Sequence, residues 1–286
     1  KFTNWLTFSS VNNIKYNNHK SRTYTDPRSS AGEGVDGRIN EYRTDMTRLY
    51  TNQLLRFNKL VGKHSLSALL AYEYNDYSGE TLSSTGIGFV PGFQILDVTA
   101  KPELARGGVS EWAVQSVFSN FNYSYDNRYL AQLSLRRDGA SNFGDNAKYG
   151  NFFSISAGWN IHQEEFFRND AVDQLKLRAS YGSVGNRPSS LYPQYDLYAV
   201  AAGNSYNGES GALISQIGNR DLTWEKSYTT GVGIDLSLYQ RLRLTLDYYD
   251  KNTSDLLYQV PVPGVTGVTR VWRNIGAVRN KGFEAI

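Results

Sequence analysis

The sequence predicts an all-β fold, specifically a portion of an antiparallel transmembrane β-barrel with roughly ten strands, short periplasmic turns and long extracellular loops. Three observations predict this class. Apolar and polar residues alternate with a period of two, short and long links alternate along the chain, and aromatic residues stand near the strand ends. A soluble β-sandwich or propeller can share the first pattern, but nothing in its architecture requires the second.

The composition narrows the class of protein further. Of the 286 residues, 14% are aromatic, led by 21 tyrosines, whose apolar ring and polar tip suit the boundary between lipid and water. The net charge of +3 gives no reason to expect a nucleic-acid partner. Without cysteine the chain has no disulfides, thiol catalysis or cysteine-ligated zinc. No apolar run reaches the roughly 20 residues of a membrane-spanning helix.

The period-two alternation is clearest over 149–161. Phe153, Ile155 and Trp159 lie on one face there, while Ser154 and Ser156 lie on the other. A slip by one residue would turn the polar positions onto the apolar face, so the pattern specifies the register. The same criterion predicts strands at 1–11, 41–60, 64–83, 112–125, 128–141, 148–161, 174–185, 221–238, 241–258 and 272–286.

The links between these strands alternate in length. Tight turns are expected at 61–63, 126–127 and 239–240, and a slightly longer link with a helical turn at 162–173. Long loops are expected at 12–40, 84–111, 142–147, 186–220 and 259–271. Outer-membrane barrels have short periplasmic turns and longer extracellular loops, so this alternation favours a membrane barrel.

Aromatic residues accompany the predicted strand ends. Because tryptophan and tyrosine prefer the headgroup region, this placement predicts an aromatic girdle at each membrane interface. The residues concerned are Trp5, Phe8, Tyr72, Tyr74, Trp112, Tyr123, Tyr125, Trp159, Trp224, Tyr248, Tyr249 and Trp272.

No catalytic constellation emerges from the sequence. His19, His64 and His162 are far apart and lack the spacing of metal ligands, so neither a metal site nor a cofactor is predicted. Asp138 and Asp145 lie near asparagines, but a polar turn explains that cluster better than a calcium loop does.

A series of short stretches from residue 129 onward has a recognisable order and spacing. It comprises 133–144 (LSLRRDGASNFG), 156–161 (SAGWNI), 164–166 (EEF), 175–182 (LKLRASYG), 185–186 (GN), 219–226 (NRDLTWEK), 247–249 (DYY), 255–257 (DLL), 274–276 (NIG) and 279–284 (RNKGFE). The series resembles the SusC/RagA family of TonB-dependent outer-membrane transporters of Bacteroidetes. The resemblance is close over 129–286 and looser over 1–128.

The resemblance implies a barrel of about 22 strands with an N-terminal plug and a segment that contacts TonB. It also implies a SusD-like surface lipoprotein as a lid, and import of an oligosaccharide or peptide through the Gram-negative outer membrane. Residues 1–286 are then expected to be part of the barrel domain, with the plug and the C-terminal strands outside this sequence. Membrane lipid is the expected surrounding, and no enzymatic activity is expected.

Charged residues on the polar strand faces are predicted to face the lumen. Exposure to lipid near mid-bilayer would cost about 2–4 kcal/mol for an arginine or lysine, whereas a wet lumen tolerates the charge. These side chains either contact the plug and solvate the interior or touch the substrate directly. They are Arg136, Lys176, Arg178, Glu225, Asp235, Arg241, Arg243 and Asp247.

The loop 186–220 is the expected place of ligand contact. It carries Tyr192, Tyr195, Tyr198 and Tyr206 among asparagine, serine and glycine. Tyrosine rings can stack on sugar faces while amides and hydroxyls bond sugar hydroxyls, but the same residues equally suit contact with a lipoprotein lid.

Three alternatives to nutrient import remain open from the sequence. The first is a TonB-dependent siderophore or vitamin receptor without a lid, and the second is a surface-binding barrel that transports nothing. The third is a soluble β-rich enzyme such as a glycosidase, which predicts an essential pair of carboxylates.

Overall fold

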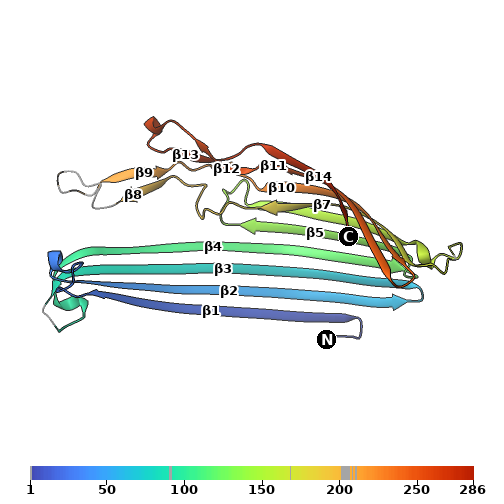
Figure 1. Cartoon of the computed structure of the whole chain (residues 1–286), viewed down its shortest axis with the longest axis horizontal. Helices are drawn as coiled ribbons and strands as arrows, with labels where there is room; N and C mark the ends of the chain where they lie inside the picture. The colour runs from blue at the N-terminus through green and yellow to red at the C-terminus, as the bar shows by residue number, and fades with distance from the viewer. Residues whose placement is uncertain (1, 90–91, 168, 201–206, 208, 210) are drawn as a thin grey trace. The chain divides into compact units, whose positions relative to one another are not determined.

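The computed structural model describes residues 2–89, 92–167, 169–200, 207, 209 and 211–286. Ten strands form one sheet in the order β1-β2-β3-β4-β5-β6-β7-β10-β11-β14 (Figure 1). They are β1 (Leu6–Thr25), β2 (Arg38–Val61), β3 (His64–Phe89), β4 (Thr99–Tyr125), β5 (Tyr129–Ala140), β6 (Tyr149–Asn160), β7 (Val172–Asn186), β10 (Glu225–Leu238), β11 (Leu242–Ser254) and β14 (Ala277–Ala285). The all-β class and the ten-stranded sheet are therefore confirmed. No helix in the described part of the chain is long and apolar enough to cross a membrane.

The chain divides into two compact units. Unit 2 comprises Val11–Thr51 and Tyr74–Ala113. It includes the links 26–37 and 90–98, which carry the short helices η1 (Glu33–Val35) and η2 (Leu96–Val98).

Ion pairs between strands run through unit 2, some between neighbours and some across an intervening strand. Arg38 Nη2 lies 2.7 Å from Glu103 Oε1, and Arg22 pairs with Glu41. Tyr16 donates a hydrogen bond to Asp45. The prediction of long loops at 12–40 and 84–111 is wrong because the strands there carry such polar contacts. Much of 12–40 and 84–111 is strand, but polar residues on both faces remove the apolar alternation by which strands are recognised.

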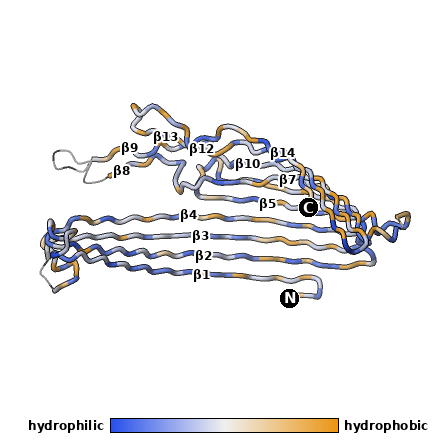
Figure 2. The backbone as a smooth tube through the Cα atoms, viewed as in Figure 1, coloured by the Kyte–Doolittle hydropathy of each residue, from blue (hydrophilic) through white to orange (hydrophobic). Residues whose placement is uncertain are grey.

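Unit 1 comprises Lys1–Ser10, Asn52–Glu73 and Val114–Ile286, and its sheet has two faces of opposite character. Rows across the strands alternate: Ala131, Ala157 and Ala179 oppose one another, and the next row is Gln132, Ser156 and Ser180. Figure 2 shows hydrophobic and hydrophilic positions alternating along these strands. We call the face with Gln132 the polar face and the other the apolar face.

The apolar face is widely exposed. Leu135, Ile155 and Val232 keep 50%, 54% and 50% of their surface accessible. Together with the neighbouring leucines of β7 and β11 they form a continuous apolar band, which lipid covers favourably and water does not.

The three predicted tight turns are confirmed. Asp126 and Asn127 have φ of 49° and 55°, and Tyr239 and Gln240 have φ of 52° and 55°. Paired left-handed residues are typical of type I′ hairpins, whose twist matches that of the strands. Gly62 has the same handedness, with φ of 57°.

Aromatic rings line the apolar face beside these turns. Tyr129 stacks between Tyr125 and Trp159, with ring centroids 6.4 and 6.5 Å apart. The Trp159 indole donates a hydrogen bond to Glu164 Oε1 at 2.9 Å, and Arg128 donates to the other carboxylate oxygen at 3.4 Å. Glu164 follows η3 (Ile161–Gln163) in the link after β6 and is buried.

Glu164 makes the stability of this end of the barrel depend on pH. Hydrogen bonds from the Tyr129 hydroxyl and the Trp159 indole hold the pKa of Glu164 below the ordinary value. Because the pKa of Glu164 is lower in the folded than in the unfolded protein, the ionised carboxylate stabilises the folded state. This stabilisation is fully present above the unfolded-state pKa of about 4.3 and is lost as the pH falls through the folded-state pKa. We expect Glu164→Gln to lower Tm at pH 7, with a difference that shrinks below about pH 4.3.

Thermal unfolding of the refolded protein between pH 7 and pH 3, followed by circular dichroism, measures this difference. The neighbouring Glu165→Gln is the matched control, because the Glu165 side chain is 86% exposed. A difference for Glu164→Gln that stays constant down to pH 3 would contradict the assignment.

Two long links contain hairpins instead of irregular loops. The link after β7 carries β8 (Leu197–Val200) and β9 (Ala212–Gln216). The link after β11 carries β12 (Leu257–Pro261), η5 (Gly264–Thr266) and β13 (Arg270–Asn274). Among the described residues, each hairpin forms a separate two-stranded sheet, so these strands extend the links and do not widen the ten-stranded sheet.

Candidate functional site

Most of the predicted lumen-facing residues do lie on the polar face. The register places Arg178 opposite Gly233, Gly233 opposite Asp247, and Lys176 opposite Asp235, all on this face. Arg243 pairs with Ser237 on the same side. Arg136 shares the face through β5.

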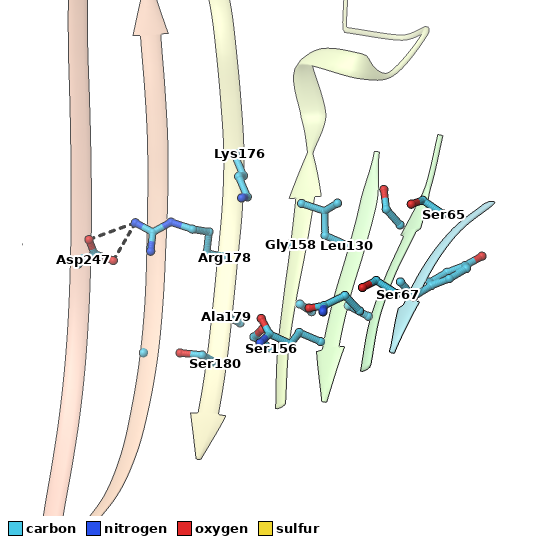
Figure 3. A pocket seen from close by; sticks show the side chains of 18 residues that line it. Ser65, Ser67, Leu130, Ser156, Gly158, Lys176, Arg178, Ala179, Ser180 and Asp247 are labelled. Atoms are coloured by element: carbon cyan, nitrogen blue, oxygen red, sulfur yellow. Dashed lines mark hydrogen bonds and ion pairs between the residues drawn. The ribbon is translucent and has the colours of Figure 1, made fainter. Parts of the chain in front are cut away.

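Arg178 is the centre of a charged network across three strands. Its Nε and Nη2 donate to the two oxygens of Asp235 at 2.9 and 3.0 Å. Nη2 also lies 3.0 Å from Asp247 Oδ1. Figure 3 shows the side chain crossing β10 to reach Asp247 on β11. All three side chains are partly exposed, at 36%, 26% and 33%, so water screens the network.

Gly233 makes this crossing sterically feasible. A Cβ at that position would lie 2.3 Å from Asp247 Oδ1 and 2.7 Å from Arg178 Nη2. The glycine therefore provides the space through which the guanidinium reaches its second carboxylate.

The polar face is hollowed beside the network. The hollow has a volume of about 480 Å³ and is lined mainly by small and hydroxyl-bearing residues with Lys176 and Arg178 at one side (Figure 3). Ser65, Ser67, Ser156 and Ser180 contribute hydroxyls. This surface offers hydrogen-bond donors and acceptors with positive charge, which suits a polar backbone or a hydrated ligand.

Arg136 has a local arrangement of its own. Its Nε donates to Asp138 Oδ1 at 2.6 Å, and Nη2 donates to the buried Ser116 hydroxyl at 2.9 Å. Its guanidinium carbon also lies 4.8 Å from the centre of the Phe118 ring. These contacts fix the side chain against the wall of the sheet.

The other two predicted residues lie at strand ends: Glu225 is on the polar face at the start of β10, and Arg241 stands just outside β11. Arg241 lies in the turn before β11, where its N–H donates a hydrogen bond to the Leu238 carbonyl, so it stands one residue outside the strand. Glu225 begins β10, and its carboxylate accepts a hydrogen bond from the Leu257 N–H at 3.2 Å. Glu225 therefore anchors the start of the β12–β13 hairpin.

The predicted tyrosines lie in the link after β7. Tyr195 and Tyr198 are 54% and 62% exposed, whereas Tyr192 is half-buried and its carbonyl accepts from Gln216. Tyr206 lies outside the described residues.

A core beneath the long links was not recognised in the sequence. Ala140, Phe143, Phe152 and Trp224 form this loop core, with Val114 packed against it. Trp224 lies 4.8 Å from Phe143 and 5.6 Å from Phe152 between ring centres. The sequence predicts Trp224 in an aromatic girdle at the membrane interface, and the structure corrects this by burying the indole in the loop core just before β10.

Side-chain amides connect the long links around this core. Buried Asn142 donates to the Ser190 carbonyl and accepts from Arg187 at 2.7 Å. Asn274 accepts from the Thr223 N–H and donates to the Thr223 carbonyl, both at 2.8 Å. These bonds join the links 141–148 and 255–276 to the described parts of 187–224, which carry the exposed tyrosines.

Comparison with known proteins agrees with this architecture. A model of the TonB dependent receptor-like β-barrel family matches residues 1–285. TonB-dependent receptor P39 of Formosa agariphila is 34% identical over 98% of this chain and 27% of its own length. TonB-dependent receptor SusC of Bacteroides thetaiotaomicron is 33% identical over 59% of this chain and 18% of its own length. The chain spans about a quarter of the length of the first curated relatives it matches.

Solved structures show the same fold. The RagAB peptide transporter matches 99% of this chain and 32% of its own chain, with 26% identity and a TM-score of 0.90. The ferric preacinetobactin receptor BauA of Acinetobacter baumannii matches with 14% identity and a TM-score of 0.52, which indicates the fold alone. The resemblance to SusC and RagA drawn from the sequence is confirmed. The chain therefore belongs to the TonB-dependent receptor-like β-barrel family, and its sheet is part of an outer-membrane β-barrel.

Proposed function

We propose that this chain is part of the barrel of an active importer that carries a bulky oligosaccharide or peptide across the outer membrane. The energy comes through TonB, and a SusD-like lipoprotein covers the outer mouth. The observation that carries the proposal is the likeness to the RagAB peptide importer, with a TM-score of 0.91 over the whole chain. The likeness to SusC supports the same class.

The geometry of the polar face supports a transport path. Hydroxyls, amides and the Arg178 network cover it, whereas the opposite face is apolar and exposed. We infer that the polar face lines the lumen, where a plug domain outside this sequence rests against it. The serines and the fixed charges solvate the path without binding any cargo tightly.

The siderophore-receptor alternative has weaker support. The likeness to the ferric preacinetobactin receptor is 14% in sequence, which concerns the fold alone. The likeness to RagAB is closer in both sequence and structure. Import of a bulky organic polymer is therefore the preferred function.

We infer that the exposed tyrosines of the link after β7 contact cargo or lid. Tyr195→Ala combined with Tyr198→Ala should weaken uptake at limiting substrate about tenfold, which corresponds to about 1.4 kcal/mol. Tyrosine is enriched among the few interface residues whose truncation costs more than about 1 kcal/mol, so one such residue in the pair is enough. The barrel itself should stay folded, since both rings are exposed in this chain. Tyr239→Asn is the matched control, an exposed tyrosine in a tight turn.

The experiment uses the full-length gene in its native host. A deletion strain is grown on defined oligosaccharide and peptide sources and complemented with the wild type or the variants. Affinity purification from solubilised outer membranes, with mass spectrometry, identifies associated proteins. Lost growth on one polymer together with a stoichiometric lipoprotein supports the proposal. A defect confined to iron limitation, with the barrel recovered alone, supports the siderophore alternative instead.

A further inference from the structure

Arg137 is an isolated charge on the apolar face of β5. The other residues of β5 on that face are Tyr129, Ala131, Leu133, Leu135 and Gly139. Arg137 follows Tyr129 of the turn-side girdle by eight residues, which is roughly 26 Å along a strand. Such strands are tilted by about 35–45°, so this is roughly 20 Å along the membrane normal, in an apolar band about 25 Å tall. Arg137 therefore stands near the edge of the band remote from the tight turns, and its long side chain leans over Tyr149 toward the depth of lipid headgroups.

The Arg137 guanidinium is held in place by an aromatic ring. Its carbon lies 4.8 Å from the centre of the Tyr149 ring, within the range of a cation–π contact. The Tyr149 hydroxyl accepts a hydrogen bond from Gln115 Nε2 at 2.6 Å. Gly139 lies between Gln115 and Tyr149 on the middle strand, and a Cβ at Gly139 would lie 2.5 Å from the Tyr149 ring. The ring is thus fixed across β5 and supports one face of the guanidinium.

The N–H groups of Arg137 remain available. Arg136, Arg178 and Arg279, also on strands of unit 1, each pair with an aspartate. Within the described ranges, no carboxylate lies within ion-pairing distance of Arg137. Asn151 is its cross-strand neighbour and is exposed. A fixed, unpaired guanidinium with an amide beside it is suited to a phosphate group.

An apolar groove adjoins this cation. It has a volume of about 440 Å³ and is lined by Leu70, Val117, Leu135 and Phe153, with Arg137 and Asn151 at its polar end. Leu70, Val117 and Leu135 are 54%, 50% and 50% exposed. All the lining residues belong to unit 1, and β4, β5 and β6 have sheet neighbours on both sides. The groove therefore needs no strand from outside this chain.

We propose that Arg137, Asn151 and the groove form a binding site for a phosphate-bearing lipid of the outer leaflet. The phosphate bonds to the guanidinium, and one acyl chain lies along Val117, Leu135 and Phe153. The charge of Arg137 favours a lipid with a phosphate group, because an uncharged lipid would fill the groove but leave the guanidinium without an anion at the membrane surface. The proposal depends on the outer-membrane location and not on the cargo of the barrel.

Native mass spectrometry of the full-length protein in detergent tests the site. The probes are monophosphoryl lipid A, the same lipid without phosphate, and inorganic phosphate as competitor. We expect Arg137→Gln to weaken binding of monophosphoryl lipid A about tenfold, since a charge-assisted contact to phosphate is lost. Val117→Trp, which fills the groove and leaves the cation, should weaken it similarly. Arg106→Gln, an exposed arginine of unit 2, is the control.

The outcomes separate the possible occupants. Preference for the phosphorylated lipid that disappears in Arg137→Gln supports the site. Equal binding of both lipids, or displacement by inorganic phosphate at micromolar concentration, overturns it. A change of oligomeric state in Val117→Trp with unchanged lipid binding also overturns it, and assigns the groove to a second copy of the protein. Heat-modifiable migration on gels confirms that each variant is folded.

Discussion

Replacing Trp224 with alanine is expected to destabilise the loop core by about 3–5 kcal/mol. The indole is 6% exposed and packs against Phe143 and Phe152. Its removal leaves a cavity that the neighbouring backbone cannot easily close, because the Asn142 and Asn274 side chains tie the surrounding links together.

The loss should be local. The ladder between β7 and β10 runs from Glu225 to Leu238 and does not need the indole, so the sheet should keep its register. Hydrogen exchange by mass spectrometry should show faster exchange in 187–224 and 255–276 and unchanged exchange in β5, β6 and β7. Val265→Ala, at a residue 95% exposed in η5, is the control and should change stability by less than about 0.5 kcal/mol. Equal effects of the two substitutions would contradict the assignment of a core.

Replacing Arg178 with leucine is expected to cost about 1–3 kcal/mol at pH 7. The substitution leaves Asp235 and Asp247 without their shared cation. Because the three side chains are partly exposed, water screens the remaining carboxylates and keeps the loss below that of a fully buried pair. Urea unfolding of the refolded full-length protein measures the change.

A double-mutant cycle separates this network from ordinary surface charge. Asp235→Asn and Asp247→Asn, each alone and combined with Arg178→Leu, give the coupling energies. We expect a triple variant, in which all three substitutions are combined, to be more stable than Arg178→Leu alone, because it has no unpaired carboxylates. Coupling below about 0.3 kcal/mol for both pairs would mean that the network is only a solvated surface cluster.

The sheet of unit 1 could be predicted closely because one face is apolar. The strand expected at 148–161 is found at Tyr149–Asn160, and the turn expected at 126–127 is found there. The outer parts of β1 to β4 could not be predicted in this way. Arg22 and Glu41 pair across strands that are polar on both sides, so no period remains to be recognised.

The candidate site was predictable only in part. The alternation of apolar and polar residues assigns Arg178, Asp235 and Asp247 to one face of the sheet. Their ion pairing also depends on Gly233, which lies between Arg178 and Asp247, and this position follows only from the register of the strands. The loop core depends on contacts between links far apart in sequence, such as Phe143 with Trp224. Local patterns do not contain that information.

The most direct test of the account is the environment of alternate residues along β6 and β7. Since these 286 residues contain no cysteine, single cysteines can be placed at Ile155, Ser156, Leu177 and Ser180 in a full-length protein made cysteine-free. Each is labelled with a nitroxide in lipid bilayers, and collision rates with oxygen and with a water-soluble nickel complex are measured. We predict a high collision rate with oxygen and a low rate with the nickel complex for labels at 155 and 177. For labels at 156 and 180 we predict a high rate with the nickel complex and a low rate with oxygen. High nickel collision at all four positions would show a sheet with water on both faces, which contradicts a membrane barrel.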